Sequence, residues 1–157
     1  MIRLIAAVDR RLGIGKHGGQ PWYLPTDEQF FSSKTKENGG IALTAKKTYL
    51  TFQGPLPERK NYVLTHDETP LPGAELVHDL PGFLEGQSDV WIIGGGQLFK
   101  QCIDEGLADE LYLTHIDADF GCHVFFPEYK DKFELVEQSD LHEENGFIFR
   151  FATYRKS

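Results

Sequence analysis

The stretch DVWIIGGGQLFKQCIDEG, residues 89–106, combines an uninterrupted apolar run, three glycines and a pattern typical of a helix. An apolar run without alternation indicates a strand that is buried on both faces, as in a parallel sheet. Glycines directly after such a strand indicate a tight turn into the following helix. This segment therefore predicts a central strand followed by a covering helix.

Similar units lie on both sides of this segment. Apolar runs at 2–8, 40–44, 60–65 and 74–78, together with DELYLTHID at 109–117, predict further strands. Helices are predicted from Thr26, where Thr26 and Gln29 fit a capping box, and over roughly 45–52 and 80–86. Strands that alternate with helices predict an α/β fold in three layers, with a mostly parallel sheet and helices on both faces. We expect residues 1–157 to form a single domain.

The C-terminal part has a different pattern. Two segments with strand character, 133–139 and 147–154, flank Asn145-Gly146, a dipeptide that favours a tight hairpin turn. We therefore expect an antiparallel strand pair to complete the sheet.

Composition excludes several classes of function. The 157 residues include 24 acidic and 16 basic side chains, a formal charge of −8, which disfavours nucleic acid or an anionic membrane as partner. Two distant cysteines and six histidines without ligand spacing predict neither a disulfide framework nor a metal site. With no long apolar run or leader-like start, we expect a cytoplasmic protein, and no feature of the sequence indicates a dimer interface.

Two cofactor-binding segments are predicted where strands end, which is where open α/β sheets bind ligands. Lys46 and Lys47 fall in the first turn of a helix expected to be capped by Thr44, where a bound phosphate would offset their unfavourable charge. Gly94-Gly95-Gly96 would let the backbone approach a pyrophosphate. Solvated lysines and an ordinary tight turn are the alternatives. Read together, the segments suggest the two ends of a dinucleotide, and the lysines favour NADP over NAD.

Asp27 is the candidate catalytic acid. In PWYLPTDEQFF, residues 21–31, it precedes Phe30 and Phe31 by three and four positions, so these side chains share one helical face. A carboxylate beside aromatic surface would have a raised pKa unless a cationic or amidine-like ligand paired with it. The alternative is a solvated acid in the first helical turn. The Gly-rich segment from Asp9 to Gln20 is predicted to form a mobile loop.

Six motifs occur in register along the chain: IAAVD, G-x-PW-x-LP-x-D, PLPERKN, WIIGGGQLF, LYLTHIDA and FFPEY. Together they closely resemble dihydrofolate reductases over essentially the whole chain. The resemblance implies NADPH-dependent reduction of 7,8-dihydrofolate to tetrahydrofolate.

The resemblance also implies roles for single residues. Asp27 corresponds to the family's acid, which binds the amidine edge of the pterin and promotes protonation of N5. Trp22 and Thr114 correspond to residues that fix this carboxylate and its water. Arg59 corresponds to the arginine that pairs with the α-carboxylate of the glutamate tail. The other implied substrate contacts are apolar: Ile5, Ala6, Phe31, Leu56 and Ile93.

Cofactor contacts are implied for several segments. They are Ala7 and Ile14 at the nicotinamide, Lys46, Lys47, Thr48, Leu64, Thr65 and His66 at the adenosine phosphate, and Gly94, Gly95, Gly96, Gln97, Leu98 and Phe99 at the pyrophosphate. The segment 13–20 corresponds to the loop that closes over the nicotinamide.

The chain departs from the family pattern at several positions. Ala45 replaces a glycine, Glu28 an apolar residue, Gln20 a methionine and Phe99 a tyrosine, and CHVFFP (122–127) lacks the Asp-Thr that helps to latch the closing loop. We expect these changes to affect affinity and loop kinetics more than activity. Two alternatives remain open: a reductase of the same fold acting on another pteridine or pyrimidine, which Arg59 disfavours, and a non-catalytic NADPH- or folate-binding module.

Overall fold

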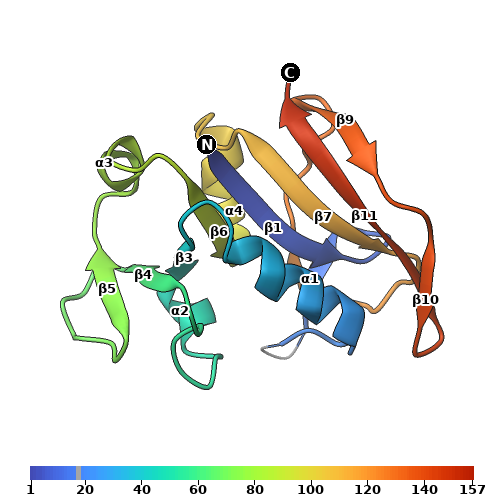
Figure 1. The fold of residues 1–157 in the computed structure, drawn as a ribbon, viewed down its shortest axis with the longest axis horizontal. Coiled ribbons are helices and arrows are strands. Elements are labelled where there is room, and N and C mark those ends of the chain that lie inside the picture. The colour runs from blue at the N-terminus through green and yellow to red at the C-terminus, as the bar shows by residue number, and fades with distance from the viewer. Residues whose placement is uncertain (17–18) are drawn as a thin grey trace.

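The computed structural model describes residues 1–16 and 19–157 and contains a sheet of nine strands (Figure 1). Its main path runs β10-β11-β7-β1-β6-β3-β4-β5, and β9 pairs with β11. At the centre, β1 (Ile2–Val8) pairs in parallel with β6 (Val90–Gly94) and β7 (Glu110–Ile116). The apolar runs that form β1, β6 and β7 thus have neighbouring strands on both sides, as their composition predicts.

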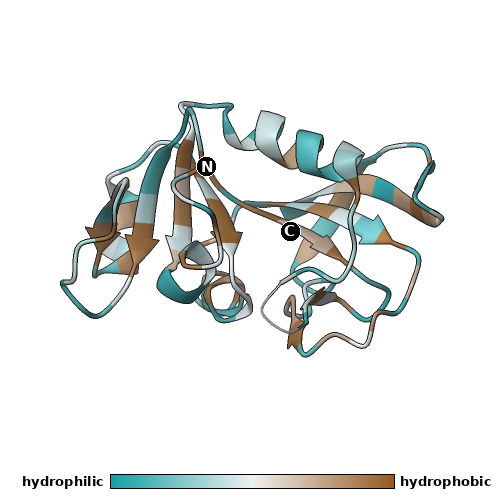
Figure 2. Cartoon of the chain, turned by 90° about the horizontal axis from the view of Figure 1, so that it is seen from below, coloured by the Kyte–Doolittle hydropathy of each residue, from teal (hydrophilic) through white to brown (hydrophobic). Residues whose placement is uncertain are grey.

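The remaining parallel strands extend the sheet on one side. They are β3 (Ile41–Ala45), β4 (Lys60–Leu64) and β5 (Ala74–Val77). The helices between strands are α1 (Pro25–Thr35), α2 (Lys46–Tyr49), α3 (Leu80–Glu85) and α4 (Gly96–Asp104). Figure 2 shows α1 lying alone on one face of the sheet, and α4 lies behind the sheet in Figure 1. The predicted three-layer arrangement is confirmed.

The C-terminal strands are antiparallel, as predicted, but the hairpin is built differently. Asn145 and Gly146, both with positive φ, join the short β10 (His142–Glu144) to β11 (Phe147–Lys156). Positive φ at both central residues is what a type I′ turn requires. β9 (Phe133–Gln138) pairs with the far end of β11, so it does not lead directly into this turn. β11 also pairs with β7, which fixes the hairpin to the centre of the sheet.

A second, two-stranded sheet was not predicted. β2 (Gly13–Gly15) lies within the segment expected to be a mobile loop and pairs with β8 (Val124–Phe125). The amides of His123 and Phe126 also donate to the carbonyls of Gly15 and Leu12, at 2.9 and 2.8 Å. These backbone hydrogen bonds join the Gly-rich segment to CHVFFP, although CHVFFP lacks the Asp-Thr pair that helps to latch this loop in the family. Residues 17–18 of the predicted loop lie outside the described part of the chain.

Two helix starts differ from the predicted capping. α1 begins at Pro25 after Leu24, and in the described structure Leu24 makes no side-chain cap. The hydroxyl of Thr26 donates to Glu144, so the predicted capping box with Gln29 is wrong. α2 begins at Lys46 after Ala45, so Thr44 is not its N-cap, although both lysines lie in the first turn as predicted.

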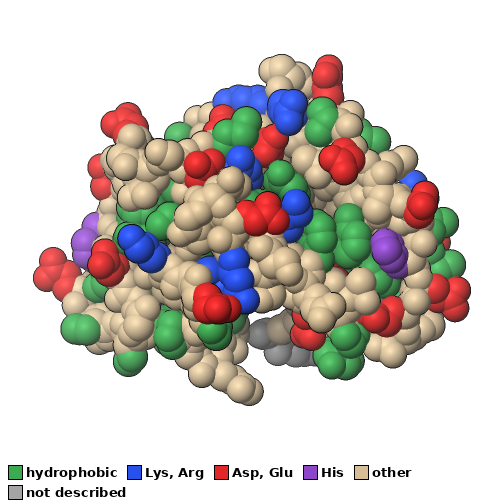
Figure 3. All heavy atoms as spheres, viewed as in Figure 1, with side chains coloured by type: hydrophobic (Ala, Val, Ile, Leu, Met, Phe, Trp, Pro, Cys, Tyr) green, Lys and Arg blue, Asp and Glu red, His purple; other side chains and the backbone are tan. Residues whose placement is uncertain are grey.

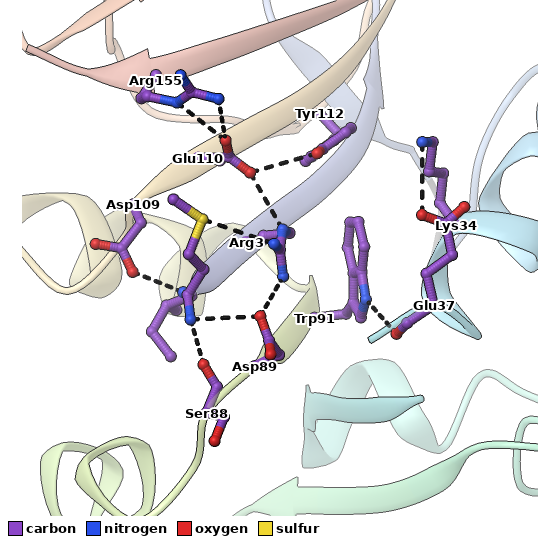
Figure 4. A network of polar contacts seen from close by, with 12 residues as sticks. Arg3, Lys34, Glu37, Ser88, Asp89, Trp91, Asp109, Glu110, Tyr112 and Arg155 are labelled. Carbon is purple, nitrogen blue, oxygen red and sulfur yellow. Dashed lines mark hydrogen bonds and ion pairs between the residues drawn. The ribbon is translucent and has the colours of Figure 1, made fainter. Parts of the chain in front are cut away.

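A polar network links the N-terminal ends of β1 and β7 to the C-terminal end of the antiparallel strand β11 (Figure 4). Glu110 of β7, 4% exposed, accepts from Arg3 of β1 at 3.1 Å and from Arg155 of β11 at 3.0 Å. Arg3 also pairs with Asp89 at 2.7 Å, and the hydroxyl of Tyr112 donates to Glu110. These contacts lie at the sheet edge opposite the carboxyl ends of the parallel strands.

Candidate active site

Asp27 is a buried carboxyl group on the face of α1 that covers the sheet. It is 9% exposed, and its Oδ1 accepts a hydrogen bond of 2.6 Å from the hydroxyl of Thr114 on β7. Burial raises the pKa of Asp27 to about 6, the Thr114 hydrogen bond opposes this rise, and the negative charges of Glu28 and Glu144 add to it. The solvated alternative is therefore wrong for Asp27, whereas Glu28 is exposed. A carboxyl group with such a pKa can hold or release a proton near neutral pH.

Trp22 lies on the segment that leads into α1. Its ring is 7% exposed and contacts Phe120, with 5.0 Å between ring centroids. The indole Nε1 is buried and finds no hydrogen-bond acceptor among the residues described. Because buried donors are nearly always paired, this N–H is available to a bound water or ligand.

The apolar residues of β1 lie next to this carboxyl group. Ala7 is the register partner of Thr114, and Ile5 is the partner of Tyr112 on the same strand, β7. Ile5 and Ala7 are buried, whereas Ala6, Ile93 and Phe31 are partly exposed. Phe30, which shares the helix face of Asp27, stacks on Phe151 of β11 at 4.1 Å. The structure thus brings Asp27 and Thr114 together with the β1 residues and leaves Phe30 to anchor the helix.

Arg59 is held at the opposite end of α1. Its Nη1 donates to the hydroxyl of Thr35 at 2.8 Å, and its Nε donates to the carbonyl of Pro57 at 2.9 Å. Within the described chain it has no acidic partner at ion-pair distance. Leu56 precedes it by three residues, in a loop fixed by hydrogen bonds of the Leu56 backbone with the Asn61 side chain. The guanidinium is therefore oriented by neutral acceptors, and its charge is not neutralised by an acidic side chain of the described residues.

The glycine turn after β6 forms a narrow meeting point of three elements. An added Cβ at Gly95 would lie 2.9 Å from Oγ1 of Thr48 in α2, and one at Gly96 would lie 2.9 Å from the carbonyl oxygen of Phe125. The same Gly96 position is 3.8 Å from Ile14 of β2. Gly94 has φ +144°, and the Gly94–Gly95 peptide bond is cis. The segments predicted to bind the nicotinamide and pyrophosphate therefore converge here, and at Gly95 and Gly96 even a methyl group would come closer than contact distance.

The predicted phosphate end lies at the neighbouring ends of β3 and β4. Lys46 and Lys47 begin α2, whereas Leu64 ends the adjacent strand β4 and Thr65 and His66 follow it. Lys46 forms an ion pair with Asp67, which holds the pKa of Asp67 below its usual range. Asp67 was not predicted as part of this site. A bound phosphate would therefore share Lys46 with a carboxylate.

Comparison with known proteins identifies the family. The family model for dihydrofolate reductase matches residues 1–156. This chain belongs to the dihydrofolate reductase family. Members of the family use NADPH, and the convergence of Ile14, Thr48 and the glycine turn fits a dinucleotide.

Relatives named dihydrofolate reductase match nearly the whole chain. The one from Bacillus subtilis is 34% identical over 99% of this chain and 95% of its own length. That from Drosophila melanogaster is 34% identical, covering 98% and 96%, and that from Aedes albopictus is 32% identical, covering 98% and 96%. The similarity thus spans Asp27, Arg59 and the glycine turn together.

The three residues after the glycine turn, which were predicted together as cofactor contacts, have different environments. Leu98 and Phe99 are 3% and 1% exposed and pack inside the main hydrophobic core, where Phe99 contacts Phe126. The side chains of Leu98 and Phe99 therefore hold α4 against the hydrophobic core, whereas the side chain of Gln97 is exposed. The tip of the Phe99 ring faces the glycine turn, because an added Cβ at Gly94 would lie 3.7 Å from its Cζ.

Two residues of the site were missed. Asp67 follows the end of β4 by three positions, so the rule that ligands bind beyond strand ends could have included it. Glu144 accepts from both the amide and the hydroxyl of Thr26, beside Asp27. Nothing local marks Glu144, because it lies 118 residues from Thr26.

Several other features lie apart from Asp27. A cavity of about 510 Å³ has His115, Tyr129, Lys130 and Arg150 in its lining, and Asp27 is not among its lining residues.

Over residues 1–16 and 19–157, no group of three or more His, Cys, Asp or Glu is placed to hold a metal ion. In the same part of the chain, every helix is too short or too polar to cross a membrane.

Proposed function

We propose that this chain reduces 7,8-dihydrofolate to 5,6,7,8-tetrahydrofolate with NADPH, and that Asp27 anchors the pterin and promotes protonation of N5. One observation carries this proposal: Asp27 is buried at the sheet, hydrogen-bonded to Thr114, with a pKa of about 6. An acid of this strength is matched to proton transfer at neutral pH.

The carboxyl group of Asp27 has a second oxygen for the substrate. Oδ1 already accepts from Thr114, and a planar N–C–N edge presents two donors at the spacing of two carboxylate oxygens. Pairing with such an edge would favour the ionised carboxylate and offset part of its burial cost. The N–H of Trp22, which lacks a partner among the described residues, can orient a water or substrate oxygen beside it.

The two ends of the substrate require different contacts. Ile5, Ala6, Phe31, Leu56 and Ile93 offer apolar surface to the pterin and benzoyl rings. Arg59, tied by Thr35 and Pro57, would bind the α-carboxylate of the glutamate tail. In Figure 3 the surface is hollowed at its lower edge, between the side that carries α2 and the side that carries α1. We expect a flat ligand to bind on this side of the molecule, at the carboxyl ends of the parallel strands.

When bound, NADPH supplies the hydride. Gly94, Gly95 and Gly96 would hold its pyrophosphate with backbone amides, and Ala7 and Ile14 would contact the nicotinamide. Lys46 and Lys47, with Thr48, Leu64, Thr65 and His66, would hold the 2′-phosphate end. Apolar walls that exclude water from the reacting atoms also strengthen the electrostatic effect of Asp27.

We further propose that the protein acts as a cytoplasmic monomer without nucleic acid or membrane partners. Support comes from its charge of −8 and from two free, buried cysteines.

The test is NADPH oxidation by the purified protein with dihydrofolate, compared with Asp27→Asn. We expect turnover by the wild type and a large loss for the variant at neutral pH, partly recovered with a substrate that is already protonated. NADPH consumption that needs another heterocycle, or tight NADPH binding without turnover, would contradict the proposal and favour one of the two alternatives.

A further inference from the structure

We propose that Glu144 is a positioning residue that caps α1 from the C-terminal hairpin and thereby fixes the placement of Asp27. The inference rests on the proposed function, because it assigns Glu144 a role at the same carboxyl group.

The contact consists of two short hydrogen bonds to one residue. Oε1 of Glu144 accepts from the amide of Thr26 at 2.9 Å, and Oε2 accepts from its hydroxyl at 2.7 Å. The neighbouring Asn145 donates from Nδ2 to the carbonyl of Tyr23 at 2.8 Å. The tip of the β10–β11 hairpin is therefore hydrogen-bonded to the backbone of Tyr23 and Thr26, on both sides of Leu24 and directly before Asp27.

The start of α1 needs such a partner. Leu24 at the N-cap position has no side-chain oxygen, and Pro25 at the first helical position has no N–H. Thr26 carries the first helical amide that needs an acceptor, and Glu144 supplies it from another strand pair. A carboxylate at this end of a helix is also favoured by the helix dipole. Glu144 thus replaces the side-chain cap that the local sequence does not provide.

Thr26 immediately precedes Asp27, so its anchoring fixes the backbone that carries the catalytic carboxyl group. The Asp27–Thr114 hydrogen bond of 2.6 Å leaves little tolerance for displacement of the first helical turn. A shift of this turn would change the fit of Asp27 both to Thr114 and to the substrate edge.

Glu144 also acts through its charge. The groups that act on Asp27 come from three elements: Thr114 on β7, Glu28 on α1 and Glu144 on β10. Both glutamates disfavour ionisation of Asp27, whereas the Thr114 hydroxyl favours it. Glu28 is exposed, but Glu144 is partly buried and fixed by Thr26. Removing either negative charge should make Asp27 a stronger acid.

Four variants separate capping from charge. Glu144→Gln keeps an acceptor oxygen but removes the charge, Thr26→Val removes only the hydroxyl donor, and Glu28→Gln removes a nearby charge that makes no cap. Glu143→Gln is the matched control, because it makes the same change at an exposed position of the same strand.

The primary measurement is an NMR titration of the Asp27 carboxyl carbon, assigned with Asp27→Asn, in the substrate-free protein. We expect Glu144→Gln and Glu28→Gln to lower its midpoint by about half a pH unit, and hydride transfer at pH 8 to slow by about threefold, because one pKa unit corresponds to tenfold. Thr26→Val should leave the midpoint within about 0.2 units and raise KM for dihydrofolate by about threefold.

Glu143→Gln should change neither quantity. An Asp27 midpoint and a KM that match those of the wild type in both Glu144→Gln and Thr26→Val would overturn the inference. If the wild type fails to turn over dihydrofolate, the proposed function fails, while the NMR titration still decides whether Glu144 sets the acid strength of Asp27.

Discussion

At the scale of a single residue, burial of Asp27 lowers the free energy of unfolding at pH values where its carboxyl group is ionised. Its folded pKa of about 6 lies above the ordinary value of 3.8, so between these pH values the native state binds more protons than the unfolded state. Stability from this group is therefore complete below about pH 3.8 and is lost as the pH rises through 6. The shift corresponds to roughly 3 kcal/mol at pH 8, at about 1.4 kcal/mol per unit.

Asp27→Asn should therefore stabilise the protein while it lowers activity. We expect the free energy of unfolding to rise by up to about 3 kcal/mol at pH 8 and by about half as much at pH 5. Urea unfolding at both pH values measures this difference. Asp140→Asn, which removes an exposed carboxylate, should show little change at either pH. Equal gains at the two pH values would contradict a raised pKa.

A second residue-scale balance concerns Lys46, which is shared between Asp67 and the proposed 2′-phosphate site. Asp67→Asn should free Lys46 and remove a nearby negative charge, so NADPH should bind several-fold more tightly while NADH changes little. The double variant Lys46→Ala with Lys47→Ala should weaken NADPH far more than NADH. Cofactor fluorescence titrations measure both, and equal effects on the two cofactors would reject the phosphate site.

At the scale of elements, the glycine turn couples β6, α2 and the β2–β8 pair. Its backbone passes so close to Thr48 and Phe125 that a methyl group at Gly95 or Gly96 would meet them at 2.9 Å. The backbone carbonyl at Phe125 belongs to a paired strand and cannot rotate away as a side chain could. Close approach, as well as backbone freedom, therefore explains why glycines occupy this turn.

Gly96→Ala should disturb this junction. We expect a loss of about 1–3 kcal/mol in the free energy of unfolding, as for other overpacked sites, together with weaker NADPH binding. Gly86→Ala is the control, because an added Cβ there would lie 3.6 Å from its nearest neighbour and its φ is −83°. Thermal unfolding with and without NADPH would measure both effects, and equal behaviour of the two variants would contradict the steric argument.

At the scale of the whole molecule, the residues proposed to bind ligands and the ion pairs that stabilise the fold lie at opposite ends of the strands of one sheet. The candidate site lies at the carboxyl ends of the parallel strands, whereas Glu110 links Arg3 and Arg155 at the other end (Figure 4). Because Arg3 and Arg155 are both register partners of Glu110, the three side chains form one row across β1, β7 and β11. This row holds the antiparallel strand, and with it the hairpin that carries Glu144, to the parallel core.

Glu110→Ala should destabilise the fold by about 1–3 kcal/mol, because Arg3, 12% exposed, loses its buried partner but keeps its ion pair with Asp89. The folded fraction of this variant should turn over substrate at a nearly unchanged rate. Glu110 begins β7, whereas the β7 residue that contacts Asp27 is Thr114, further along the strand. Glu137→Ala on β9 removes an exposed carboxylate and should have little effect. Urea unfolding and steady-state kinetics measure the two properties, and a large loss of kcat without a loss of stability would contradict this separation.

The sequence by itself determined the main succession of strands and helices, the parallel core, the glycine turn and the Asn-Gly turn, whereas the short strands β2, β8 and β10 were not predicted. These features depend on apolar periodicity and on backbone preferences that act over a few neighbouring residues. The family motifs also located the residues proposed to bind substrate and cofactor. β2 was missed because Gly-Ile-Gly has no strand pattern of its own, and it forms only where β8 offers a partner.

Only the tertiary structure decided the environment of those residues. It buried Asp27 against Thr114, gave Lys46 a carboxylate partner, and replaced the expected capping box with Glu144, 118 residues from Thr26. Each depends on which groups from distant segments share a low-dielectric space. Because electrostatic and hydrogen-bond energies are set by distance and burial in the folded chain, separation along the sequence does not reveal them.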